Sequence, residues 1–457
     1  MITKTISTVF ITFFLYTSVF AQSLSKSIDF LLKDTLFHDS DVSLAIYDLD
    51  ADSMLYTYRE NKLCRPASSL KLLTSVVALE RLGRDYTIKT SLYEKKNISG
   101  GTNLYIKGEI DPLFNEDDLL DMLATIPKKI SVDTLFADCT FMDSVYWGPG
   151  WSWDDTPWEF QPYISPLMLC GGCVEVSAKP SSKGEPPIVE CTPKSAFYTI
   201  VNEAVSYVDS GSKFTILRDW LENCNTIRLR GDCNAPKSEK MNLYSSQNYF
   251  ITVAKERLSE KEVDIKHCAF AETPTDATLL HQTEQPIADV IHEALMESNN
   301  LCAEALTYHL GALFGERPVH QKMGPEIIKA FLDYTIKAET EYNIADGSGL
   351  SLYNYLSAEM LIKVLRHAYH NSDIFDVIYK SLPVSGVSGT MKHRTKNSSA
   401  YKKIHAKTGT VKGVCTLAGY VQATNGHTLA FVIFNQNSMN SHAVRMWQDK
   451  VCTLLCK

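Results

Sequence analysis

Ser68 and Lys71 stand three positions apart at the head of a long apolar run. On a helix, residues at this spacing share one face, so the lysine amine can approach the serine hydroxyl. Burial disfavours the charged form of an amine and lowers its pKa, which would let Lys71 act as a base. The helix N-terminus also favours negative charge that develops beside Ser68. The pair indicates either nucleophilic catalysis by serine or an exposed lysine beside a capping serine.

A second group of polar residues, Lys407-Thr408-Gly409, occurs once in the chain, just before an apolar strand-like run. The lysine amine and the hydroxyls of Thr408 and Thr410 together suit a carboxylate. Glycine lets another backbone or a ligand approach closely. A turn that enters an edge strand would explain the glycine but not the whole cluster. We therefore predict a carboxylate-binding site at this position.

A Ser-x-Asn motif fits three places in the chain, at residues 246–248, 298–300 and 438–440. The first leads straight into a helix-like run, and the last follows the final strand-like run. Ser298 and Asn300 lie between two apolar helical runs, where a helix–helix connection can face a cleft. We take these two residues as the candidates.

The elements that position these motifs can be predicted from turn signals and apolar periodicity. A helix over residues 66–82 begins at a proline with small residues and ends at a Leu-Gly pair. It is apolar nearly all round, which predicts burial. Residues 41–60 alternate around a central Asp-rich turn, which is typical of two antiparallel strands. Strand-like runs at 413–422 and 427–437 precede a final helix from about Ser441.

The middle of the chain, residues 84–275, has a different composition and pattern. Short strand-like pieces alternate there with turns and Pro/Gly-rich loops, which indicates inserted material of mixed or mostly β character. Helices return from about residue 276. A length of 457 residues exceeds what one core usually supports. We therefore predict an α/β (α+β) domain, an antiparallel sheet flanked by helices, built from residues 22–83 and 276–457 and split by the insert.

Residues 1–21 follow the plan of a secretory signal, with a basic start, an apolar middle and a small residue, Ala21, at the cleavage point. The apolar run is shorter than the ~20 residues that a membrane span needs. We expect cleavage and no membrane span in the mature chain. The net charge of −8, without a basic block, argues against nucleic acid as a partner.

Twelve cysteines in an exported chain favour some disulfides, whose pairing the sequence does not give. Cys170 and Cys173 form the one close pair. A thioredoxin-like motif should open a helix, but a strand-like run follows, and zinc would need a second pair or suitably spaced histidines. We expect a structural or unpaired role for this pair, and neither a metal nor a cofactor in the protein.

Ser-x-x-Lys, Ser-x-Asn and Lys-Thr-Gly together resemble the signature of penicillin-binding proteins and serine β-lactamases. The closer resemblance, over about residues 25–440, is to the penicillin-binding protein 4-like D-alanyl-D-alanine carboxypeptidases of the class C low-molecular-mass group. Similar blocks are RPASSLKLLTSVVALERLG, GPGWSWDD, DGSGLSLYNYLS, LPVSGVSGTMKHR and KTGTVKGVCTLAGYV. The 230 positions from Ser68 to Ser298 fit the large insertions of this family, which simple β-lactamases lack. Ser298-Asn-Asn departs from the commoner Ser-Asp-Asn, and Leu352 stands where the family often has arginine.

The resemblance implies a β-lactamase/transpeptidase-like fold and an exported, periplasmic serine D-Ala-D-Ala carboxypeptidase. Its partners would be peptidoglycan stem peptides, with β-lactam antibiotics as inhibitors and DD-endopeptidase action as a second activity. A serine β-lactamase is the nearest alternative, although no separate hydrolytic base is evident in the sequence. A wall-binding protein that has lost catalysis is the other, and the intact motifs argue against it.

The resemblance also assigns catalytic roles to five residues. Ser68 attacks the carbonyl between two terminal D-alanines and forms an acyl-enzyme. Lys71 accepts the serine proton, and Ser298 relays a proton to the leaving D-alanine. Lys407 tunes the local field, and Asn300 hydrogen-bonds the substrate amide.

Substrate binding is assigned by resemblance to the cluster that begins at Lys407. Thr408 and Thr410, with Gly409 between them, hold the terminal carboxylate. The backbone N–H groups of Ser68 and Thr410 form the oxyanion hole.

A loop over residues 146–160 holds four tryptophans and three acidic residues. It is either pinned to its own domain by tryptophan burial, or it overhangs the cleft and binds the substrate beyond its D-alanines. In the second case a carboxylate would pair with the free amine of a diamino acid in the stem peptide. The resemblance supports this second alternative, because an acidic residue of the inserted domain faces the cleft in related enzymes, and we assign the role to Asp155 rather than Asp154.

Overall fold

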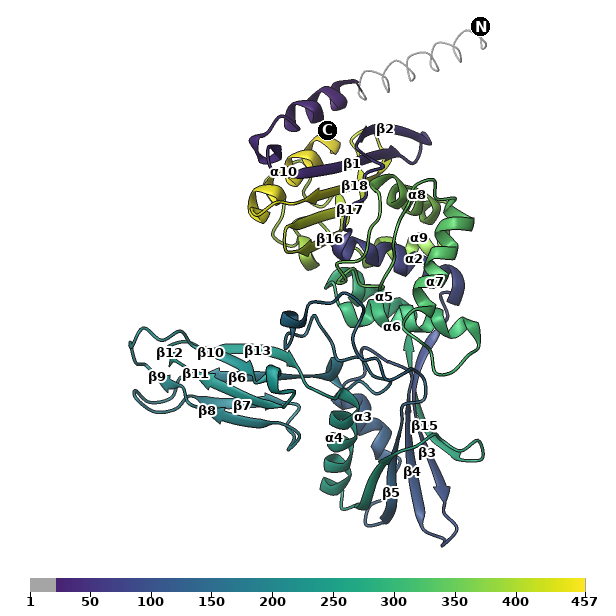
Figure 1. Cartoon of the computed structure of the whole chain (residues 1–457), viewed down its shortest axis with the longest axis vertical. Coiled ribbons are helices and arrows are strands. Elements are labelled where there is room, and N and C mark those ends of the chain that lie inside the picture. The colour runs from purple at the N-terminus through teal and green to yellow at the C-terminus, as the bar shows by residue number, and fades with distance from the viewer. Residues whose placement is uncertain (1–21, 457) are drawn as a thin grey trace. The chain divides into compact units, whose positions relative to one another are not determined.

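The computed structural model describes residues 22–456, whose elements are labelled in Figure 1. These residues form two compact units, each described by itself. The first unit comprises the chain up to Arg84, Ile291–Asn299 and the chain from Pro325, and the second comprises Asp85–Val290 and Asn300–Gly324. The signal sequence expected at residues 1–21 lies outside the described residues, and the domain ranges expected from the sequence stay a prediction.

The first unit is built on a five-stranded antiparallel sheet in the order β16-β17-β18-β1-β2. Its strands are β1 (Asp41–Asp48), β2 (Ser53–Tyr58), β16 (Ile404–Val411), β17 (Val414–Gln422) and β18 (Thr428–Gln436). Because β1 pairs with β18, the N-terminal hairpin completes a sheet whose other strands come from the C-terminal end of the chain. The sheet therefore brings sequence-distant motifs into one unit.

Both faces of this sheet are covered by helices, which explains why β17 and β18 are apolar almost throughout. Alternate residues of a strand point to opposite faces. On one face, Phe431 of β18 belongs to a core cluster with Ile28 and Trp447, which come from the helical residues 22–31 and from α10 (Ser441–Leu455). On the other face, the Tyr420 hydroxyl of β17 donates to the Leu365 carbonyl of helix α8 (Ala358–Tyr369) at 2.9 Å.

The first unit contains further helices. They are α2 (Leu70–Leu82), α7 (Met323–Ala330), which continues as a π-helix at Phe331–Ile336, α8 (Ala358–Tyr369) and α9 (Ser372–Ser381). Helix α5 (Ile287–Met296) enters this unit from the second one. Helix α2 is buried along Leu70–Leu79, so it runs through the core. An apolar surface all round suits a helix with neighbours on every side.

The second unit contains one mixed five-stranded sheet and three smaller sheets. The large sheet has the order β14-β5-β4-β3-β15, with β3 (Thr87–Lys96), β4 (Thr102–Gly108), β5 (Ser131–Asp138), β14 (Asp264–Phe270) and β15 (Thr278–Pro286). The smaller sheets are formed by β6 (Cys173–Lys179), β7 (Ile188–Thr192) and β13 (Lys237–Asn242); by β8 (Thr199–Asn202), β10 (Thr215–Arg218) and β11 (Thr226–Arg230); and by β9 (Val205–Ser206) and β12 (Asp232–Cys233). Its helices are α3 (Glu116–Ala124), α4 (Ser246–Glu260) and α6 (Asn300–Gly311).

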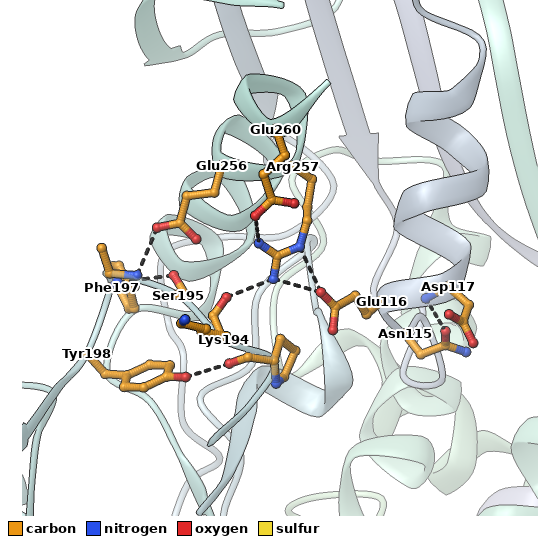
Figure 2. A network of polar contacts seen from close by, with 12 residues as sticks. Asn115, Glu116, Asp117, Lys194, Ser195, Phe197, Tyr198, Glu256, Arg257 and Glu260 are labelled. Carbon is orange, nitrogen blue, oxygen red and sulfur yellow. Dashed lines mark hydrogen bonds and ion pairs between the residues drawn. The ribbon is translucent and has the colours of Figure 1, made fainter. Parts of the chain in front are cut away.

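Figure 2 shows how Arg257 of α4 ties together parts of the second unit. Its guanidinium lies 2.7 Å from the carboxylate of Glu116, the first residue of α3, and 3.1 Å from that of Glu260. It also donates to the carbonyl of Lys194 at 2.7 Å. The Arg257 side chain is only 9% exposed, so these partners satisfy a charge that would otherwise be costly to bury. The contacts fix α4 against α3 and against the loop that precedes β8.

The predicted fold class is confirmed, and so are the elements next to the motifs. The hairpin of β1 and β2, the buried helix α2 and the final elements β17, β18 and α10 lie where the sequence predicted them. One expectation is wrong in detail, because residues 278–286 form strand β15 rather than helix. The Lys-Thr-Gly cluster does precede an apolar strand, β17, as predicted, and it lies itself in strand β16, which the sequence did not predict.

The twelve cysteines of the chain, all within residues 22–456, form no disulfide in the structure, so the expected disulfides are absent from it. Cys170 and Cys173 are not joined to each other. Across residues 22–456, no helix is both long and apolar enough to cross a membrane.

Candidate active site

Ser68 lies in a short 3-10 turn, Ala67–Ser69, that leads directly into α2. Lys71, one turn further, is fully buried, and its Nζ donates to Ser68 Oγ at 2.9 Å. Ser68 is only partly buried, so its hydroxyl can be reached while the amine behind it cannot. Of the two alternatives that the sequence left open, the exposed lysine is wrong.

A second contact of Lys71 comes from a loop that is 277 residues away in sequence, where the Ser348 carbonyl accepts from Nζ at 2.7 Å. Asp346 organises this loop, because its carboxylate accepts from the backbone N–H groups of Gly349 at 2.9 Å and Ser351 at 2.6 Å. In the sequence, the Asp-Gly-Ser-Gly block at residues 346–349 is notable only for its resemblance to the family. The structure shows that this block positions the lysine.

Ser298 and Lys407 form a second serine–lysine pair in the same unit. Lys407, in β16, is fully buried, and its Nζ donates to Ser298 Oγ at 2.8 Å. Burial, and next the positive charge of Lys71, hold the pKa of Lys407 well below its usual value, and Glu297 partly opposes this. Ser298 has a φ of 65°, a left-handed conformation that costs a non-glycine residue about 1–3 kcal/mol.

Gly409 allows strand β16 to pass directly beside the turn that carries Ser68. A Cβ at this position would stand 2.9 Å from the Ser68 backbone N, 3.1 Å from the Ala67 Cβ and 2.2 Å from the Thr416 Oγ1. Only glycine therefore fits without displacing the backbone of Ser68. This close approach is the kind that the sequence predicted for the glycine.

Ser68, Ser298 and the Thr408–Thr410 segment all line one cavity of about 520 Å³. The other residues that line this cavity were not predicted from the sequence, and they are Thr390, His393, Arg394, Cys415, Thr416, Arg445 and Gln448. Thr408 Oγ1 is 2.8 Å from Thr390 Oγ1, and Thr410 Oγ1 accepts from Arg445. A larger cavity, about 790 Å³, lies between residues 22–31 and α10 and contains none of the predicted site residues.

Asn300 and Asp155 belong to the second unit and are described there. Asn300 is the first residue of α6, and its side-chain amide donates to the Phe160 carbonyl at 2.6 Å. Asp155 ends a 3-10 turn, Trp153–Asp155, and burial raises the pKa of its carboxyl, with a smaller contribution from the charge of Asp154. The Trp153 side chain is 70% exposed, so tryptophan burial does not account for this part of the loop.

The lowered pKa of Lys407 predicts that Lys407→Met makes the protein more stable and less active. Between that lowered pKa and about 10.5, the native state binds fewer protons than the unfolded chain, so the free energy of unfolding of the wild type rises with pH. Replacing a buried ionic group by an apolar one can stabilise a protein by about 1–4 kcal/mol. We expect a gain of this size near pH 7, determined by denaturant unfolding, which shrinks toward pH 10. In the serine carboxypeptidase that the resemblance implies, loss of the Ser298 contact should slow the reaction by about 10²-fold.

Lys412→Met is the matched control, because Lys412 is an exposed lysine in the turn that follows β16. It should change neither stability nor activity. A stability gain for Lys407→Met that is equal at both pH values would contradict the assigned pKa direction.

Comparison with known proteins gives one family and several relatives. The sequence pattern of the D-Ala-D-Ala carboxypeptidase 3 (S13) family matches residues 24–456. A D-alanyl-D-alanine carboxypeptidase of Actinomadura sp. (strain R39) is 27% identical over 471 residues, which span 95% of this chain and 84% of that protein. The D-alanyl-D-alanine carboxypeptidase DacB of Haemophilus influenzae is 25% identical over 419 residues, which span 88% of this chain and 87% of that protein.

Solved structures share the fold at lower identity. Penicillin binding protein 4 from Haemophilus influenzae superposes with a TM-score of 0.79 at 21% identity, covering 92% of this chain and 97% of that one. A predatory peptidoglycan endopeptidase from Bdellovibrio bacteriovorus gives a TM-score of 0.52 at 17% identity, covering 91% of this chain and 92% of that one. These likenesses, found independently of the motifs, agree with the fold predicted from the sequence.

Proposed function

Because the chain belongs to the D-Ala-D-Ala carboxypeptidase 3 (S13) family, and is therefore a carboxypeptidase of the serine type, we propose that Ser68 is its nucleophile and Lys71 its base. One observation carries this assignment: the amine of a fully buried Lys71 is 2.9 Å from a reachable Ser68 hydroxyl. A nucleophile and a base within hydrogen-bond reach, with the base held by a third group, are the arrangement that activates a serine. Here the Ser348 carbonyl is the third group.

In the proposed reaction, Ser68 Oγ attacks the carbonyl carbon of the penultimate D-alanine and its proton moves to Lys71 Nζ. The backbone N–H groups of Ser68 and Thr410 stabilise the oxyanion. Ser298, held by Lys407, passes a proton to the departing amine of the last D-alanine. Water then attacks the acyl-enzyme and releases the shortened peptide.

Recognition of the stem peptide completes the proposal. The hydroxyls of Thr408 and Thr410 bind the terminal carboxylate, with Gly409 keeping their strand beside the nucleophile. We propose that Asn300 hydrogen-bonds the substrate amide, as the resemblance implies. The enzyme would be exported and would act on peptidoglycan in the periplasm.

Two linked measurements test the assignment. The wild type, incubated with a peptide that ends in D-Ala-D-Ala, should release free D-alanine. Penicillin should leave a long-lived adduct that mass spectrometry maps to the peptide containing Ser68. An adduct on another serine would refute the nucleophile, and repeated fast hydrolysis of a chromogenic cephalosporin would favour a β-lactamase. Absence of D-alanine release would favour a wall-binding protein.

Endopeptidase action is a second candidate, because the scissile bond of a cross-linked stem peptide also follows a D-alanine. The same acyl-enzyme would therefore serve both reactions. Digestion of cross-linked muropeptides, followed by chromatography, distinguishes the activities: dimers that stay intact would restrict the enzyme to carboxypeptidation.

Asp155 is proposed to bind the free amine of the diamino acid in the stem peptide. We expect Asp155→Ala to lower kcat/KM by about 10–100-fold on peptides that bear this amine, because a partly desolvated charge pair is lost. Activity on a diacylated D-Ala-D-Ala peptide without the amine should be nearly unchanged. Asp154→Ala is the matched control, since Asp154 is the exposed neighbour. Equal losses on both peptides would make the loop structural, and a loss only for Asp154→Ala would move the assignment by one residue.

A further inference from the structure

The cavity that contains Ser68 is lined by basic side chains and by no acidic one. His393, Arg394 and Arg445 line it, and the described residues place neither aspartate nor glutamate on its wall. A wall with this charge favours an anionic group on the bound molecule.

The two arginines of this wall differ in whether a carboxylate already neutralises them. Arg394 is 12% exposed and already neutralised, because its Nη2 lies 2.7 Å from Asp449 and also donates to the carbonyl of Arg445 at 3.1 Å. Arg445 itself is exposed and forms no ion pair with a carboxylate of residues 22–456. Its Nη2 lies 3.4 Å from Thr410 Oγ1, a hydroxyl proposed to hold the substrate carboxylate. Arg445 is therefore a positive charge still available to a ligand.

The helix that carries Arg445 is firmly attached to the sheet. In α10, Trp447 is buried and its Nε1 donates to the Leu31 carbonyl at 2.9 Å. Gln448 is also buried and donates to Asn435 of β18 at 3.0 Å. These contacts fix the backbone of Arg445 beside the site, so only the side chain has to be ordered when a ligand binds. Less conformational entropy is lost in that case.

We propose that Arg445 selects substrates that have a free α-carboxylate next to the scissile bond, an inference that rests on the proposed roles of Ser68 and Thr410. When Thr410 Oγ1 accepts from Arg445, its own hydrogen remains free to donate to the carboxylate. The guanidinium can donate to the same carboxylate, and hydrogen bonds between charged groups are stronger than those of a hydroxyl alone. A C-terminal carboxamide has no charge to offer, and it would leave Arg445 unpaired in the complex.

Arg445 should favour some substrates and not others. The favoured class includes peptides that end in free D-alanine, and cross-links whose leaving amino acid keeps its own α-carboxylate. It excludes stem peptides in which that carboxylate is amidated. β-Lactams that carry a carboxylate fall inside the class, and their neutral esters fall outside it.

The test compares two N-acylated peptides that differ only at the C-terminus, one ending in D-Ala-D-Ala and the other in D-Ala-D-alaninamide. Both reactions are followed through the same shortened peptide. The wild type should prefer the carboxylate, and Arg445→Met should lower kcat/KM for that substrate by about 10–30-fold. The loss on the carboxamide should be no more than about threefold, so that the preference collapses. Arg445→Lys should keep part of the preference, because the charge remains while the planar fork is lost.

Lys450→Met is the matched control. Lys450 is an exposed lysine on the same helix, and it lines the larger cavity instead. It should leave both rates and their ratio unchanged. Equal losses on the two peptides for Arg445→Met, or an unchanged preference, would overturn the proposal while the wild type still released D-alanine. A wild type that released none would instead refute the proposed function.

Discussion

Lys71→Ala should lower the rate at which penicillin acylates Ser68 by about 10²–10⁴-fold, the range that loss of a general base typically produces. The reason is geometric, because Lys71 Nζ is 2.9 Å from Ser68 Oγ and no solvent reaches it. D-alanine release should fall by a similar factor, since both reactions begin with the same attack. Labelling with a fluorescent penicillin gives the acylation rate, and chromatography gives the release of D-alanine.

Lys71→Arg should not rescue the reaction, because a guanidinium stays protonated and cannot accept the serine proton. Arg81→Ala is the matched control, since Arg81 is an exposed cation in the last turn of the same helix. It should acylate at the wild-type rate. If Lys71→Ala acylated as fast as Arg81→Ala does, Lys71 would not be the base. Circular dichroism should show that the variants are folded, because an apolar replacement of a buried charge need not destabilise the core.

Local patterns predicted the parts of the site that depend on local structure. The spacing of Ser68 and Lys71 placed them on one helix face, and helix α2 is as buried as its composition indicated. Among the three Ser-x-Asn motifs, the choice of Ser298 agrees with its contact to Lys407. Ser246, by contrast, is a buried residue at the start of α4, and its hydroxyl donates to the Tyr163 carbonyl at 2.7 Å.

Contacts between distant segments could not be predicted in the same way. The Ser348 carbonyl reaches Lys71 across 277 positions, and a backbone carbonyl leaves no trace in residue type. Arg445 lies on a helix whose periodicity shows which face is buried, but not which cavity the other face borders. Strand β15 was missed because it is mostly half-exposed and lacks clear alternation, and because its partner β3 lies about 190 residues earlier.

Gly409→Ala should lower kcat/KM by about 10²–10³-fold, the cost of removing one oxyanion-hole donor. The added Cβ would stand 2.9 Å from the Ser68 backbone N and 2.2 Å from Thr416 Oγ1, so β16 and the turn of Ser68 must move apart. That movement would take the N–H groups of Ser68 and Thr410 away from the oxyanion position proposed for them. The backbone of Gly409 is not in the left-handed region, so alanine adds crowding there rather than φ strain.

Gly413→Ala separates this effect from a simple loss of stability. Gly413 lies in the turn between β16 and β17, where an added Cβ meets nothing within 4 Å but the φ of +80° strains alanine. Both variants should lose about 1–3 kcal/mol of unfolding free energy, one through crowding and the other through strain. Only Gly409→Ala should lose D-alanine release and penicillin acylation together. Equal losses of activity in the two variants would mean that Gly409→Ala acts through lost stability rather than through the site. Full activity of Gly409→Ala would show that the close approach of β16 to Ser68 plays no part in catalysis.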